Sequence, residues 1–155
     1  MIFREFLLIM AATFCFSILC NIRGKNICFA ALGGGITWIF YSYSTNQLHM
    51  GIYSVLAASM AAGIYSEIMA RTLKAPVTAF VICAIIPLVP GGGMYHTMLQ
   101  TVQGNVDASA ALGLQTLATA AYIAVGVFVI TSFFRMSAIV KKKLNLRTLK
   151  KHHPV

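Results

Sequence analysis

The residues best suited to bind a small charged solute lie in and directly after a proline- and glycine-rich run near the middle of the chain. This run is Ile-Pro-Leu-Val-Pro-Gly-Gly-Gly at positions 86–93. It cannot continue a regular helix, because proline lacks an amide donor and glycine costs backbone entropy. A half-helix that starts after such an interruption presents free N–H groups and a partial positive charge to an anion. We therefore predict a substrate-binding segment that contains Pro87, Pro90, Gly91, Gly92, Gly93, Tyr95 and His96.

The interruption has two interpretations. In the first, a membrane-spanning helix breaks partway, and the carbonyl groups of residues 86–89 form a complementary site for a cation. In the second, the run is an ordinary turn at the outer membrane surface. Residues 75–89 would extend only about 22 Å as a helix, which is shorter than the hydrocarbon layer of about 30 Å. This length favours the broken helix.

Titratable side chains are scarce, since the acids are limited to Glu5, Glu67 and Asp107. Glu67 and Asp107 are our candidates for proton coupling, which requires an ionisable group near the solute path. Each has a structural alternative. Glu67 precedes Arg71 by four residues, a spacing that permits an ion pair on one helix face. Asp107 follows Gly104-Asn105, where either Asn105 or Asp107 could cap a helix.

The composition around these residues predicts an all-α integral membrane protein. Hydrophobic residues make up 59% of the 155-residue chain and charged residues 10%, whereas a soluble domain carries roughly 25% charged residues. Apolar stretches of about 20 residues span the hydrocarbon as helices. We predict a transmembrane domain over 1–140 with about five spanning helices, the fourth of them discontinuous, and a basic cytoplasmic tail over 141–155. The spans are expected at about 6–22, 27–44, 51–69, 75–103 (broken at 87–93) and 106–134.

Basic residues predict the orientation. Of the twelve Lys and Arg residues, all but Arg4 lie in the 23–25 loop, the 71–74 loop or the region from Arg135 onward. Five spans place these regions on one side, in agreement with the positive-inside rule. The N-terminus is then outside and the C-terminus cytoplasmic, where the tail would be attracted to anionic lipid. This distribution, rather than binding to nucleic acid, accounts for the net charge of +9.

Other functional classes find little support. The four cysteines form no CxxC pair, and we interpret them as small buried apolar residues. The spans contain no catalytic pairing of Ser with His or Asp with Asp, and no HExxH motif. We therefore expect no enzyme activity, no cofactor and no metal. Small residues such as Ala57, Ala61 and Gly63 predict close helix packing, either within the chain or in a homo-oligomer.

The run Ile86–Gly91 followed by Tyr95, the glycines after Cys28 and the segment Lys74-Ala75-Pro76 resemble the threonine/serine exporter (ThrE) superfamily. The similarity covers about residues 6–134 and is greatest to the small, YjjB-like subunit, which corresponds to the C-terminal five-span half of the single-chain exporters. The Gly91-Gly92-Gly93 triplet is more glycine-rich than the family pattern.

The resemblance implies a function in the bacterial cytoplasmic membrane. The expected activity is secondary-active, proton-driven export of threonine, serine or related small carboxylates, including dicarboxylates. The expected partner is a larger, YjjP-like membrane subunit, which could also supply the coupling residue. The alternative is an accessory subunit that stabilises its partner and has no transport path of its own.

Overall fold

The computed structural model describes residues 2–46 and 51–152, with side chains for 4–46 and 51–137. These residues form helices and no strand, which confirms the predicted helical class. The helices are α1 (Ile2–Leu19), α2 (Asn26–Asn46), α3 (Tyr53–Leu73), α4 (Val77–Ile85), the short 3₁₀ helix η1 (Ile86–Leu88), α5 (Gly91–Val102) and α6 (Val106–His152).

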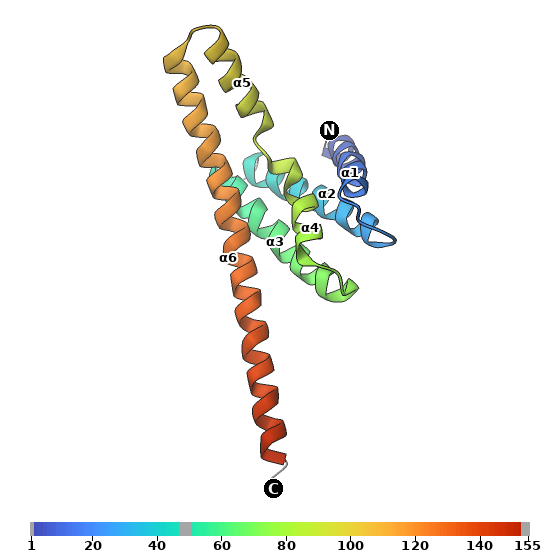
Figure 1. Cartoon of the computed structure of the whole chain (residues 1–155). Helices are drawn as coiled ribbons and strands as arrows, with labels where there is room; N and C mark the ends of the chain where they lie inside the picture. The colour runs from blue at the N-terminus through green and yellow to red at the C-terminus, as the bar shows by residue number, and fades with distance from the viewer. Residues whose placement is uncertain (1, 47–50, 153–155) are drawn as a thin grey trace.

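The helices form a bundle from which a hairpin and a single helical arm project (Figure 1). α1 packs on α2, α2 on α3, and α4 on both α2 and α3. α6 packs on α3 and continues past the bundle in both directions. Its first part pairs with α5 as a hairpin at one end, and its C-terminal part extends alone at the other. α3 is therefore the central helix of the molecule.

Small and hydroxyl residues allow the bundle helices to approach closely. A Cβ on Gly33 would meet the ring of Tyr65 from α3 at 2.8 Å, and a Cβ on Gly34 would collide with Thr13 from α1. The Tyr65 hydroxyl donates to the carbonyl of Phe29 at 2.7 Å, which also ties α3 to α2. Glycines that admit neighbouring side chains supply the contact area that drives helix association in lipid.

The helix interruption is shorter than the sequence predicted. α4 passes through η1, and only Val89 and Pro90 lie outside helical turns before α5 begins. Gly91, Gly92 and Gly93 form the first turn of α5, so the prediction that the break includes them was wrong. Pro90 immediately precedes that turn and donates no backbone hydrogen bond, which is tolerated at a helix start. α4–η1 and α5 meet at a bend of 53°.

Hydropathy and length identify fewer spans than the five we predicted. In the described residues, α2 and Val106–Ser137 of α6 are long and apolar enough to cross a membrane, and the bent pair Val77–Leu88 with Gly91–Val102 would be a third. α3 has the same length as α2 and, like α2, buries hydroxyl residues, but it also carries the charged residues Glu67 and Arg71. A helix surrounded by other helices can carry such residues, because lipid does not contact them.

The last predicted span, 106–134, lies within Val106–Ser137, the part of α6 that is long and apolar enough to cross a membrane. α6 continues as a helix to His152, so the predicted tail is helical over 141–152, and 153–155 lie outside the described residues. The prediction that all four cysteines are buried was wrong. Of the four cysteines only Cys83 is buried, whereas Cys15, Cys20 and Cys28 are exposed. These three lie on the outer sides of α1 and α2 or in their connection, where an apolar thiol can face lipid.

Candidate functional site

A cavity of about 660 Å³ lies between α3, α4 and α6. α4 and α6 both pack on α3, which leaves a groove between them with α3 as its floor. One part of the wall is apolar and includes Val81, Ile82 and Phe128. The polar side chains that line it are Glu67, Arg71, Thr78, Thr131, Ser132 and Arg135. This volume falls within the range of small-molecule sites, roughly 300–1,000 Å³.

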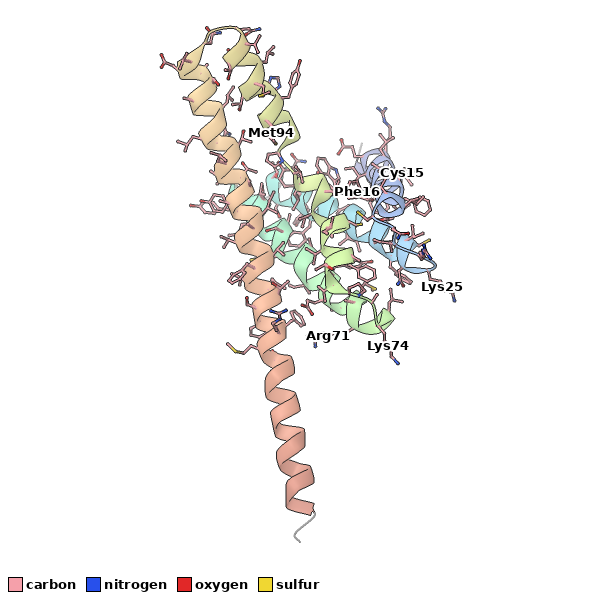
Figure 2. The ribbon with its side chains drawn as sticks, in the orientation of Figure 1. Cys15, Phe16, Lys25, Arg71, Lys74 and Met94 are labelled. Atoms are coloured by element: carbon pink, nitrogen blue, oxygen red, sulfur yellow. The ribbon has the colours of Figure 1, made fainter. Side chains whose placement is uncertain are left out.

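The cavity lies toward the end of the bundle that carries the basic loops. Figure 2 shows Arg71 and Lys74 at this end, with Met94 toward the opposite end, beyond α4. Arg71, Ala75 and Arg135 line the cavity. Lys74 occupies the left-handed turn after α3, with φ 50°, and its amide donates to the carbonyl of Ala70. This turn and Pro76 direct the chain back into α4, which forms one wall of the groove.

Glu67 and Arg71 form the ion pair that their spacing permits. The Arg71 Nε and Nη2 atoms each lie 3.3 Å from Glu67 Oε2. Nη2 also donates to the carbonyl of Phe134 at 3.1 Å, and the guanidinium lies 5.1 Å from the centre of the Phe134 ring. The ion pair lies within α3, and Arg71 links α3 to α6 through the carbonyl contact and the cation–π contact with Phe134.

Glu67 keeps one oxygen available to the cavity. Its side chain is 9% exposed, yet Oε1 accepts no hydrogen bond from the described residues, because both Arg71 contacts go to Oε2. No fully buried side-chain oxygen or nitrogen of the described residues lacks a partner. Oε1 must therefore retain access to open space, and Glu67 lines the cavity. The site thus offers an acceptor for a cationic group.

Arg135 supplies a second positive charge to the cavity. It is exposed and forms no ion pair within residues 4–46 and 51–137. Thr131 precedes it by one helical turn, and Thr131 donates its hydroxyl to the Val127 carbonyl, which leaves the oxygen free to accept. Glu67, Arg71 and Arg135 together carry a formal charge of +1, so the cavity attracts anions while retaining one carboxylate.

The predicted substrate-binding segment lies elsewhere. Leu88, the last residue of η1 before the interruption, is 6% exposed and packs with Val55 and Ala58 of α3 and Ile123 of α6. Tyr95 is 64% exposed and stacks edge-on against His96, with ring centres 5.4 Å apart. None of the α5 side chains is buried. Val89, where the interruption begins, follows Ile82 of the cavity wall by seven residues, which is about two helical turns or roughly 10 Å along the axis.

The candidates for proton coupling are separated. Glu67 lines the cavity, whereas Asp107 lies in the first turn of α6, at the far end of the α5–α6 hairpin. α6 begins after Asn105, so Asn105 rather than Asp107 occupies the cap position. The Asn105 side-chain amide donates to Gln100 Oε1 at 2.9 Å. Asp107 therefore contributes only its charge near the positive end of the helix dipole.

The structure thus brings Glu67 together with residues that the sequence did not indicate. Arg71 was named only as the partner of Glu67, and Thr78, Thr131, Ser132 and Arg135 were not among the candidates. One sequence signal was available, because Thr131 and Arg135 are four residues apart and so share a helix face. The juxtaposition with Glu67 depends on how α6 packs on α3, which no local pattern specifies.

A family model described as "Threonine/Serine exporter, ThrE" matches residues 5–133. The match includes the bundle, the helix interruption and the lining residues of the cavity up to Ser132. No curated protein and no solved structure matches the chain.

Proposed function

Because the chain belongs to the threonine/serine exporter family, we propose that it is a subunit of a secondary-active exporter of small amino or carboxylic acids. It works in the bacterial cytoplasmic membrane with a larger membrane partner and uses the proton gradient. Family membership supports exporter-type transport, and the remaining points are our inference.

One observation carries this proposal: an apolar helical protein keeps a nearly buried carboxylate and two guanidinium groups around one cavity. Ionisable groups within membrane proteins are energetically expensive, so they mark solute and ion pathways. A small amino or carboxylic acid carries groups complementary to these charges. Glu67 can also exchange a proton, and it is the coupling residue that we favour over Asp107.

The helix interruption provides a hinge for alternating access. α4 forms one wall of the cavity, and it joins α5 through η1, Val89 and Pro90 at a 53° bend. The Val89 amide bonds back to the Ile86 carbonyl, and the Gly91 amide bonds to the Val89 carbonyl. Short local bonds of this kind rearrange more easily than a continuous helix ladder. Movement of α4 about Pro90 would open and close the groove against α6.

The orientation and the partner remain proposals with physical support. Basic loops and the C-terminal end of α6 lie toward one end of the molecule (Figures 1 and 2), as expected if that end is cytoplasmic. The cavity would then open toward the cytoplasm, where an exporter collects its solute. α5 has no buried side chain, so its apolar surface faces either lipid or the larger partner.

Reconstitution into vesicles tests this function. Vesicles that contain this chain and its larger partner should release labelled threonine or serine when a proton gradient is applied, and a protonophore should abolish the release. Either protein alone should be inactive. The Pro90→Ala/Gly92→Leu double variant should slow efflux at least tenfold, while the exposed control Ala124→Leu should not. If the assembled pair moves no small acid, the chain is an accessory subunit or serves another process.

A further inference from the structure

We propose that the groove between α3, α4 and α6 is a binding site for a zwitterionic amino acid. In this site Glu67 Oε1 takes the ammonium group, and Arg135, with the free edge of Arg71, takes the carboxylate. The inference rests on the proposed transport function and adds the position of the solute and the role of each charged side chain.

The charged side chains of the groove favour a ligand that carries both a positive and a negative charge. Arg71 is already paired with Glu67, and it donates a hydrogen bond to the Phe134 carbonyl. Arg135 has no acidic partner in the described part of the chain. A cation beside an apolar wall attracts an anionic group. A ligand with only a carboxylate would satisfy Arg135 but would experience repulsion from Glu67. A zwitterion satisfies both groups and leaves the Glu67–Arg71 pair intact.

The geometry of the groove agrees with a small, hydroxylated ligand. The cavity holds about 660 Å³, which accommodates an amino acid together with water. Thr78 on α4 and Ser132 on α6 line it, and neither side chain donates a hydrogen bond to another described residue. Their hydroxyl groups are available to a substrate hydroxyl. An anionic lipid headgroup could also reach Arg135, but Glu67 Oε1 gives the zwitterion the better fit.

Binding of tritiated L-threonine to the complex with the larger partner, in phosphatidylcholine nanodiscs, tests this assignment. Two competitors separate the charges: 3-hydroxybutyrate lacks the ammonium group, and threonine methyl ester lacks the carboxylate. Glu67→Gln should weaken threonine about tenfold to a hundredfold, as expected for loss of a charge-assisted hydrogen bond. The same variant should leave 3-hydroxybutyrate unchanged or strengthen it.

Arg135→Gln should weaken threonine and 3-hydroxybutyrate by similar factors and leave the methyl ester unchanged. The control Lys25→Gln removes an equal charge outside the cavity and should change nothing. If Glu67→Gln fails to assemble with the partner, Ser132→Leu fills the groove without altering its charge and should block threonine binding.

Two results would overturn the site and leave the transport function standing. In the first, the complex exports threonine, but neither Glu67→Gln nor Arg135→Gln changes the affinity for threonine. In the second, Glu67→Gln reduces the affinities for threonine and 3-hydroxybutyrate by equal factors. In a third contradicting result, phosphatidylglycerol co-purifies with the wild type but not with Arg135→Gln, and the affinity for threonine is unchanged. Arg135 would then bind the phosphate of a lipid headgroup and not the carboxylate of threonine. Absence of both binding and efflux in the wild-type complex would instead reject the proposed function.

Discussion

At the scale of single residues, the three glycines that begin α5 have different surroundings. A Cβ on Gly93 would lie 2.5 Å from the Thr116 hydroxyl of α6, whereas Gly91 and Gly92 have no neighbour within 4 Å. Thr116 cannot turn away freely, because its hydroxyl donates to the Leu112 carbonyl at 2.7 Å. Gly93 is therefore required for close packing of the hairpin, and Gly92 is not.

We expect Gly93→Ala to destabilise the purified protein by about 1–3 kcal/mol through overpacking. Gly92→Ala should stabilise it by up to about 1 kcal/mol, since alanine favours the helix. The midpoint of thermal unfolding in detergent measures the stability change in each variant. Gly93→Ala combined with Thr116→Ala should recover most of the loss, and no recovery in that double variant would show that the Thr116 contact is not the cause.

One residue contact could be anticipated from local spacing. The four-residue spacing of Glu67 and Arg71 permits an ion pair, which was the structural alternative for Glu67, and the structure contains it. The role of Glu67 in proton coupling stays a prediction. The contact of Arg71 with Phe134 joins residues that are 63 positions apart, so it depends on the packing of α3 against α6. Local spacing carries no information about such contacts.

At the scale of elements, the cavity depends on the close contact between α3 and α6, since both helices line it. A Cβ on Gly126 would collide with the Ser59 hydroxyl and would also lie 3.1 Å from the Leu56 carbonyl oxygen. A Cβ on Gly63 would meet the Ile130 Cβ at 3.1 Å. The two helices therefore touch through backbone, and α6 holds Arg135 over the groove only while this contact persists.

Gly126→Leu should separate α3 from α6, reduce the thermal midpoint in detergent and abolish transport by the assembled pair. Ala124→Leu places the same side chain at an exposed position of α6 and should preserve both properties. Ser59→Ala should rescue Gly126→Ala only in part, since the Leu56 carbonyl belongs to the backbone and cannot move aside. Full rescue would place the obstruction in the Ser59 side chain alone.

The helix interruption illustrates what could be predicted at this scale. Pro87 and Pro90 indicated a break, because proline removes a backbone donor wherever it occurs. The extent of the break could not be predicted, since glycine disfavours a helix by only about 1 kcal/mol. Contacts between α5 and α6, including the close approach of Gly93 to Thr116, compensate for that cost and keep the triplet helical.

At the scale of the whole molecule, the helical class followed from the apolar stretches, but the groove did not. α4 and α6 are separated by α5 in the chain and meet only because both pack on α3. The apolar stretches gave five candidate spans, whereas by length and composition two or three of the described helices qualify. α3 differs because a central helix can carry polar residues that lower its average hydropathy.

The five-span orientation predicts the location of reporter fusions. Alkaline phosphatase, which folds only outside the cytoplasm, should be active when fused after Asn105 and inactive when fused after Lys25, Lys74 or Lys143. Green fluorescent protein should show the opposite pattern. Active phosphatase after Lys143 would require an even number of crossings or the reverse orientation.

Accessibility of a single cysteine in the groove tests the central claim, that this cavity lies on the transport path. Ser132→Cys, in a chain whose four native cysteines are replaced by alanine, would be treated with a membrane-impermeant maleimide in vesicles of known orientation with the larger partner present. We predict modification from the cytoplasmic side that threonine slows several-fold. Modification unaffected by threonine, in a complex that still exports it, would contradict the account.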